Sequence, residues 1–147
     1  MADATPDQSP SPDGYSLLLA AEFRDRNVSS LRRQVDHVVR HTGLSAQQVD
    51  GFVIAVNEVM ANAVRHGGGS GRLRLWRGSD VVCQIEDQGQ GFPASEYLDR
   101  IERPVPSSAG GMGLWLAQQT TDSLAIDSGP TGTTVHISAY LPLHPDT

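Results

Sequence analysis

The amino-acid sequence predicts an α+β fold: a two-layer sandwich in which about three helices cover one face of a mixed, mostly antiparallel sheet. Short apolar runs of β type are joined by turn-like sequences, which favours hairpins over long parallel crossovers. Two helical segments follow the first such run, and a third precedes the last hairpin. Helices grouped between hairpins are typical of a sheet with its helices on one face.

A single domain is expected over residues 15–142. Residues 1–14 are rich in Pro, Asp and Ser, which supply too little apolar burial to offset the entropy of ordering, so this segment should be a disordered tail. Residues 143–147 should form a short C-terminal tail. We see no targeting signal and no apolar run of ~20 residues, so the sequence predicts a cytoplasmic protein that does not enter a membrane.

Composition excludes several enzyme classes. The 147 residues carry a net charge of -6, and all 11 cations are arginines. Without lysine there is no Schiff-base lysine, no P-loop lysine and no V-A-I-K kinase lysine. The acidic balance argues against direct nucleic-acid binding. The single cysteine, Cys83, excludes an internal disulfide and a cysteine-based zinc site.

The first strand and the first helix are expected at residues 15–23 and 27–42. The strand is the apolar run YSLLLAAEF. The helix begins at NVSS, in which Asn27, Ser29 or Ser30 supplies a cap, and Gly43 ends it. Its apolar stripe consists of Leu31, Val35, Val38 and Val39. His37 and His41 are spaced i, i+4 but lack the glutamate of HExxH, so they predict a surface or partly packed pair rather than a zinc site.

A longer helix is expected from Ser45 to about His66, with Gln48 completing a capping box. At roughly 100° per residue, its apolar side chains fall on one arc that should face the core. These residues are Val49, Phe52, Val53, Val56, Val59, Met60 and Ala63.

Three polar residues, Glu58, Asn62 and His66, follow the border of this stripe at i, i+4 and i+8. They form either an ordinary solvated edge or a chemical site. An asparagine oxygen suits a hard cation such as magnesium, which takes its other ligands from phosphate and water. A glutamate one turn earlier suits a base acting on a hydroxyl group or water. The helix alone leaves both interpretations open.

Two further hairpins complete the expected sheet. Their strands are expected at residues 72–77, 81–86, 123–126 and 133–141. Between the hairpins lie an irregular stretch at 92–109 and a third helix at 110–121. Irregular stretches of that length are usually functional or mobile.

Two glycine-rich segments flank this stretch. Asp87, Gly89 and Gly91 form D-x-G-x-G after a strand; the glycines permit close approach of a ligand to the backbone, and the carboxylate accepts a hydrogen bond from an amine such as that of adenine. The GGMGL sequence at 110–114 opens a helix, whose free amides favour phosphate. Neither motif is specific alone, and neither is the dinucleotide fingerprint.

In combination, E-x3-N-x3-H, D-x-G-x-G, G-G-x-G-L and a Gly-Thr strand start resemble the GHKL ATP-binding superfamily of histidine kinases and the gyrase ATPase domain. The resemblance covers most of residues 27–141. Within the superfamily, the wording NEVMANAVRHG and GGMGLWLAQQTTD is most similar to bacterial anti-sigma factor serine/threonine kinases. The chain leaves no room for the phosphoacceptor-histidine helices of a histidine kinase.

The resemblance implies roles for particular residues. Glu58 would be the general base and Asn62 the magnesium ligand, with Arg65 and His66 beside the site. Asp87 would contact the adenine amine. The other implied positions are Gly89 and Gly91 at the base, Gly110, Gly111, Met112, Gly113 and Leu114 around the phosphates, and Thr133 in support of Asp87.

The resemblance also implies an ATP lid at residues 92–109, in which Arg100 or Arg103 would reach the γ-phosphate. The sequence does not choose between these arginines. Arg103 is taken as the candidate for the γ-phosphate contact.

The function implied is Mg2+- and ATP-dependent phosphorylation of a Ser or Thr in a STAS-type anti-anti-sigma partner, together with sequestration of a sigma factor. Related kinases suggest a homodimer. One alternative is a nucleotide-gated binding module of the same fold without catalysis. Another is a degenerate fold that binds no nucleotide, against which the retention of every motif argues.

Overall fold

The computed structural model describes residues 14–66, 68–87, 117, 119–129 and 132–142. The expected tails, the lid, both glycines of the D-x-G-x-G motif that follow Asp87, and the GGMGL segment lie outside these ranges. So do the two lid arginines. Expectations for those residues therefore remain predictions.

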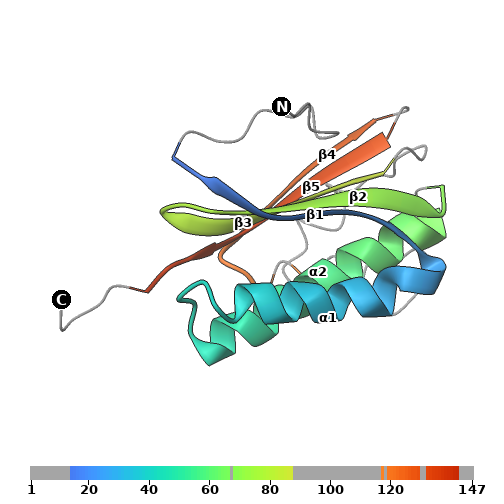
Figure 1. Cartoon of the computed structure of the whole chain (residues 1–147). Coiled ribbons are helices and arrows are strands. Elements are labelled where there is room, and N and C mark those ends of the chain that lie inside the picture. Colours follow the sequence, from blue (N-terminus) through green and yellow to red (C-terminus); the bar gives the residue numbers. More distant parts are fainter. Residues whose placement is uncertain (1–13, 67, 88–116, 118, 130–131, 143–147) are drawn as a thin grey trace, which may run out of the picture.

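Five strands form one sheet in the order β1-β2-β3-β5-β4 (Figure 1). The strands are β1 (Ser16–Arg24), β2 (Ser70–Arg77), β3 (Asp80–Asp87), β4 (Ser123–Gly129) and β5 (Gly132–Tyr140). All four neighbouring pairs are antiparallel. The antiparallel character is confirmed, and the described strands contain no parallel pair of the kind that a mixed sheet would include.

The strands match the predicted runs but extend beyond some of them. The largest difference is in β4, which continues to Gly129 rather than ending at Ile126. It does so because Asp127 and Ser128 continue the ladder with β5, opposite Thr134 and Thr133. Pairing across the hairpin thus lengthens a strand whose own residues carry little β propensity.

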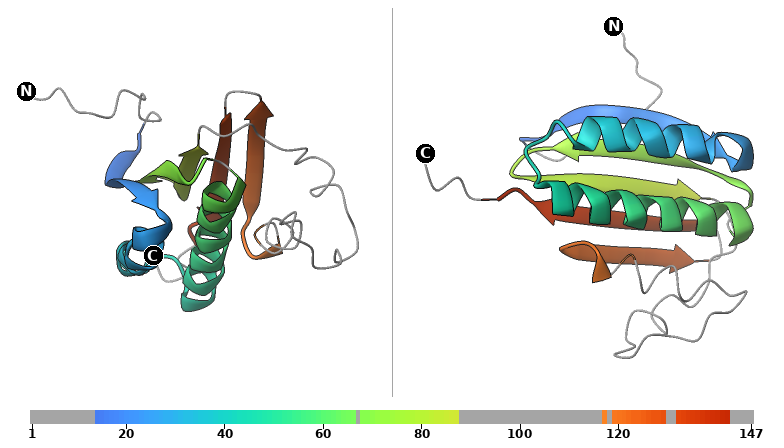
Figure 2. Two further views of the ribbon diagram at one scale, coloured as in Figure 1. Left: turned by 90° about the vertical axis from the view of Figure 1, so that its right-hand side faces the viewer. Right: turned by 90° about the horizontal axis from the view of Figure 1, so that it is seen from below.

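The helices α1 (Val28–Val39) and α2 (Ala46–His66) lie side by side on one face of the sheet (Figure 2). Of the expected third helix, the structure describes Ala117 and Gln119 with helical backbone, whereas Thr120 and Thr121 form a turn and a bend, so the helical backbone ends before the predicted Thr121. Within the described part of the chain, neither helix combines the length and the apolarity that a bilayer span requires.

The start of α1 differs from the expectation. A 3-10 turn, η1 (Asp25–Asn27), precedes the helix, and the Asn27 side chain makes no capping hydrogen bond. Instead, Asn27 Oδ1 accepts a hydrogen bond from the Arg24 amide at 2.6 Å, and Asn27 Nδ2 donates to the Glu22 carbonyl at 3.1 Å. The side chain therefore fixes the passage from β1 into the turn. The helix ends at Val39, and Gly43 then adopts a φ of 106°, which favours glycine.

The start of α2 confirms the predicted capping box. Ser45 Oγ accepts a hydrogen bond from the Gln48 amide at 3.1 Å, and Gln48 Oε1 accepts one from the Ser45 amide at 3.0 Å. Gln48 Nε2 also donates to the carbonyl of Tyr140 at 2.6 Å. The same side chain therefore caps α2 and attaches it to the end of β5.

The core lies between the two helices and the sheet. Every apolar residue predicted to face the core from α2 is buried. Alternate residues of the strands meet this stripe, as expected for a sheet with one covered face. From β3 they are Val81, Cys83 and Ile85, and from β5 they are Val135, Ile137 and Ala139.

Candidate functional site

Three element ends that carry predicted site residues lie at one end of the molecule. The C-terminal end of α2, the end of β3 and the start of β5 are found together there (Figure 2, right). In addition, α2 packs against both β3 and β5. Residues distant in sequence, from the E-x3-N-x3-H helix, the D-x-G-x-G strand and the Gly-Thr strand, are thus brought to a common region.

Asn62 lies at this end of α2 and is only 5% exposed. Its carboxamide oxygen accepts a hydrogen bond from Arg65 Nη2 at 2.8 Å. A guanidinium only donates, so this bond fixes the oxygen, rather than the amide nitrogen, on the side of the cation. The neutral oxygen of Asn62 is therefore oriented toward a positively charged group. This fits a magnesium ligand, since magnesium favours oxygen atoms and needs few from the protein.

Glu58 lies one turn before Asn62 and is half-buried. It makes no hydrogen bond or ion pair with any residue that the structure describes. The carboxylate is therefore not engaged as a structural ion pair with the described residues. Along the polar edge predicted for α2, the Glu58 carboxylate is thus partly accessible, whereas the Asn62 carboxamide one turn later is buried.

Asp87 ends β3, directly opposite Thr133 of β5. The alternation along β3 places Asp87 on the same side of the sheet as Cys83 and Ile85, the side that the helices cover. Thr133 follows the same alternation on β5 and is 3% exposed. The strand register thus makes Asp87 and Thr133 neighbours, on the sheet face that α2 covers.

The remaining predicted residues divide into two groups. Arg65 is exposed at the end of α2 and contacts Asn62. His66 is the last residue of that helix, and only its backbone is described. Gly89, Gly91, Arg103 and the segment at 110–114 lie outside the described residues. The structure therefore describes the helix and strand ends of the expected site, but not the loop residues.

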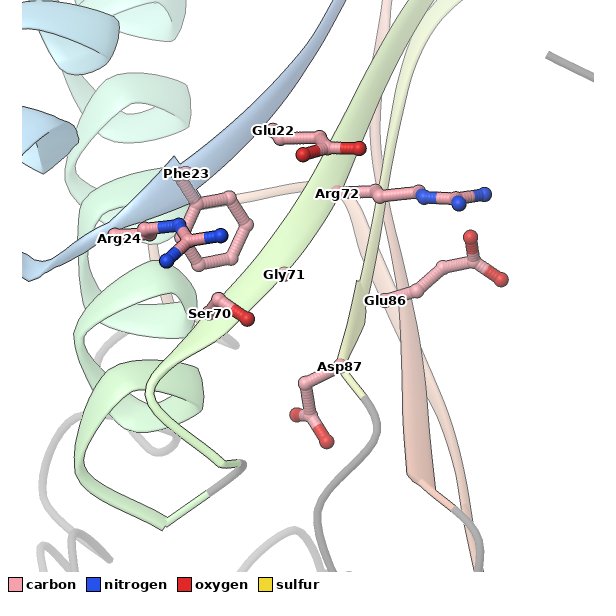
Figure 3. Close-up of a pocket in the computed structure, with 8 residues that line it drawn as sticks. All are labelled: Glu22, Phe23, Arg24, Ser70, Gly71, Arg72, Glu86 and Asp87. Carbon is pink, nitrogen blue, oxygen red and sulfur yellow. The ribbon is translucent and has the colours of Figure 1, made fainter. Parts of the chain in front are cut away.

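A pocket of about 330 Å3 that the sequence did not predict opens beside Asp87 (Figure 3). It is lined by Glu22, Phe23, Arg24, Ser70, Gly71, Arg72, Glu86 and Asp87. A side chain on Gly71 would lie 2.4 Å from the Glu86 carbonyl oxygen and 2.5 Å from the Phe23 ring. Glycine at position 71 therefore allows β1 and β3 to approach β2 closely at this end of the sheet.

The outer face of the sheet carries an ion pair next to this pocket. Arg74, which is 4% exposed, donates to Glu86 Oε1 at 2.9 Å. The two residues are diagonal neighbours, since Arg74 lies opposite Gln84. The pair holds the Glu86 side chain on the face away from the helices. Glu86 is therefore unsuited to the helix-side chemistry expected of the neighbouring Asp87.

The described residues contain no cluster of three or more His, Cys, Asp or Glu side chains suited to holding a metal ion. Magnesium in nucleotide sites commonly takes most of its ligands from phosphate oxygens and water, a pattern to which a single amide oxygen such as Asn62 Oδ1 is suited. His37 on α1 and His41 in the turn that follows it are both exposed, with ring centroids 4.8 Å apart, so the predicted surface pair is confirmed.

Comparison with known proteins agrees with this arrangement. A family model described as the histidine kinase-like ATPase domain matches residues 21–139. The serine-protein kinase RsbW of Bacillus velezensis is 27% identical over 146 residues, which cover 90% of this chain and 89% of RsbW.

Two solved structures share the fold. The first contains the RsbU and RsbW domains of Rv1364c from Mycobacterium tuberculosis; it has a TM-score of 0.60 and 19% identity over 90% of this chain. This chain spans 33% of that one. The second is the mycobacterial sensor histidine kinase MprB, with a TM-score of 0.52 and 23% identity, covering 83% of this chain and 97% of that one. At these identities, the two structures support the fold alone.

Proposed function

Because the chain belongs to the histidine kinase-like ATPase family, we propose that it binds ATP with Mg2+ and phosphorylates a Ser or Thr of a partner protein. The observation that carries this proposal is the placement of Asn62, Asp87 and Thr133 at one end of the sheet. The similarity to a serine-protein kinase over 90% of the chain supports protein as the acceptor class.

In the proposed complex, adenine lies at the end of β3. The Asp87 carboxylate accepts a hydrogen bond from the exocyclic amine, and Thr133, its neighbour across the ladder, supports it. Gly89 and Gly91 border the base, and the backbone of residues 110–114 surrounds the phosphates. Arg103 in the lid is proposed to contact the γ-phosphate.

Asn62 Oδ1 would hold the magnesium ion, which supplies charge neutralisation to the β- and γ-phosphate oxygens. Glu58, half-buried one turn earlier, takes the proton from the acceptor hydroxyl. The hydroxyl oxygen then bonds to the γ-phosphorus, while the bond from phosphorus to the bridging oxygen breaks and ADP leaves with that electron pair. His66 adjoins this region at the end of α2.

The proposed acceptor is a STAS-type anti-anti-sigma protein, and the proposed second activity is sequestration of a sigma factor, in the cytoplasm. Both rest on the resemblance of the motifs to anti-sigma kinases and on the RsbW relative. A homodimer is proposed on the same grounds. No direct binding of nucleic acid or membrane is proposed.

The test follows label from [γ-32P]ATP into a cognate STAS protein and, in parallel, measures the thermal shift that ATP or ADP produces with Mg2+. The wild-type protein should label its acceptor and gain stability with nucleotide, because a ligand of the native state stabilises it by mass action. Glu58→Gln should lower the labelling rate by about 10²- to 10⁴-fold, the usual contribution of a general base, and should retain the thermal shift.

Asp50→Asn is the matched control, since Asp50 is an exposed carboxylate about two turns earlier on the same helix. It should behave as wild type in both assays. Thermal shift without label in the wild-type protein would instead favour the nucleotide-gated binding module. The absence of both signals would exclude nucleotide-dependent function, and loss of nucleotide binding in Glu58→Gln would contradict the role of Glu58 as a base.

A further inference from the structure

The hydrogen bond between Arg65 and Asn62 occupies the atom on which metal binding would depend. Arg65 Nη2 lies 2.8 Å from Asn62 Oδ1, a short distance typical of a charge-assisted hydrogen bond. The two residues are one turn apart at the C-terminal end of α2. The oxygen assigned to magnesium therefore already has a positively charged partner from its own helix.

The two side chains differ in what they lose when this bond breaks. Asn62 is 5% exposed, and a buried carboxamide oxygen without a partner is unfavourable. Arg65 is exposed, and Asn62 is its only hydrogen-bond or ion-pair partner among the residues that the structure describes. Arg65 can therefore leave and be solvated by water, whereas Asn62 needs a replacement for it.

A guanidinium and a divalent cation that bind the same carbonyl oxygen destabilise each other. Two positive charges a few ångströms apart repel, and the repulsion grows as water is excluded from the site. Binding of Mg2+ to Asn62 therefore requires Arg65 to move. Once displaced, the exposed guanidinium is free to pair with anionic oxygens of a bound triphosphate, to which arginine binds well.

We propose that Arg65 is an internal cationic occupant of the metal position at Asn62, which Mg2+ displaces on binding together with ATP. This inference rests on the proposed function. Without nucleotide, Arg65 satisfies the buried oxygen and weakens binding of the free metal. With nucleotide, the phosphates supply metal ligands and an alternative partner for Arg65. Arg65 thus makes the site selective for the metal–nucleotide complex over the free metal.

The test uses Mn2+ as the probe, because its binding can be followed by electron paramagnetic resonance in the absence of nucleotide. Arg65→Met should bind free Mn2+ about three- to tenfold more tightly than wild type, the range that one net hydrogen bond contributes. Arg33→Met, which removes an exposed arginine from α1, should leave the affinity unchanged. Arg65→Lys, which keeps the charge but not the planar fork, should be intermediate.

A double-mutant cycle separates competition at Asn62 from a general effect of charge. In an Asn62→Ala background, Arg65→Met should no longer raise the affinity for Mn2+. A gain of the same size in that background would overturn the inference, as would equal affinities of Arg65→Met and Arg33→Met. The Arg65→Lys measurement provides a test that does not depend on how well Asn62→Ala folds.

Calorimetry with ATP and Mn2+ on the wild-type protein distinguishes failure of this inference from failure of the proposed function. If the wild-type protein binds Mn2+–ATP but the Arg65 variants show no change in free Mn2+ affinity, Arg65 is not a competitor and the proposed function stands. If the folded wild-type protein binds no Mn2+–ATP, the proposed function fails and this inference fails with it.

Discussion

Asp87, the last residue of β3, lies directly opposite Thr133, the second residue of β5. Both strands are interior to the sheet, since β3 is flanked by β2 and β5, and β5 by β3 and β4. A carboxylate at this position is therefore fixed by pairing on both sides, and Gly71 of β2 lies opposite it on the other flank. Such rigidity suits the adenine contact that is proposed for Asp87.

The first prediction concerns this carboxylate. Asp87→Asn replaces one acceptor oxygen by an amide that donates toward the adenine amine, itself a donor. We expect the affinity for ADP to fall at least about tenfold in isothermal titration, the cost of leaving a polar group of the site unpaired. Asp127→Asn, an exposed carboxylate on β4, is the control. Unchanged affinity in Asp87→Asn would remove Asp87 from the base site.

The second prediction concerns Gly51 in α2. An added Cβ would lie 2.3 Å from the Thr120 carbonyl oxygen, closer than any real contact. Glycine to alanine inside a helix ordinarily stabilises by about 0.5–1 kcal/mol. Here we expect Gly51→Ala to lower the free energy of unfolding by about 1–3 kcal/mol, because backbone atoms must shift.

Urea denaturation measures this effect, with Gln47→Ala, an exposed change in the first turn of the same helix, as the control. A gain in stability for Gly51→Ala would show that the backbone at Thr120 is not held against α2. A loss would show that the segment just before β4 is anchored on the helix that carries Glu58 and Asn62.

The third prediction concerns Cys83, which is fully buried in β3. Burial raises the pKa of its thiol well above the usual range, so the native protein keeps the thiol protonated. Reaction with Ellman's reagent at pH 8 should be slow in buffer and fast in denaturant. Rapid labelling of the native protein would contradict the burial of this strand.

The same shift in pKa makes stability depend on pH. The folded pKa is raised, so this contribution is fully present below the unfolded value of about 8.5 and is lost as pH rises above it. Between pH 7 and pH 9.5, we expect the wild-type protein to lose about 1.4 kcal/mol more stability than Cys83→Ala, as one unit above the unfolded pKa implies. Urea unfolding at the two pH values measures these losses. If wild type and Cys83→Ala lose the same amount of stability, the thiol does not contribute to the pH dependence.

Much of the fold could be predicted because its determinants are local. The reciprocal bonds of Ser45 and Gln48 depend on residues three positions apart, and the apolar arc of α2 depends only on helical periodicity. The sequence offers Asn27 as one of three candidates for the cap of α1, but its side chain bonds instead to the backbone of Glu22 and Arg24. That competition depends on how β1 enters the turn, which composition does not reveal.

The site was predictable to a lesser extent. The spacing of Glu58 and Asn62 located the polar edge of α2, but not the bond from Arg65 that occupies the Asn62 oxygen. The pocket beside Asp87 and the ion pair between Arg74 and Glu86 were missed, because both depend on the register of β2 against β3. A one-residue slip would exchange the faces of every side chain, and turn composition alone does not exclude it.

The position of β5 has a consequence for how the protein is made. This strand comes last in the sequence but lies inside the sheet, between β3 and β4. During synthesis, β2 and β3 can pair as a hairpin and β1 can pair with β2 once both helices have been made, whereas β4 has no neighbour among the strands until β5 emerges. A chain that stops before β5 lacks the strand that joins β3 to β4, and Thr133 with it. The sheet end that carries Asp87 and Thr133 is therefore completed only once β5 has been made.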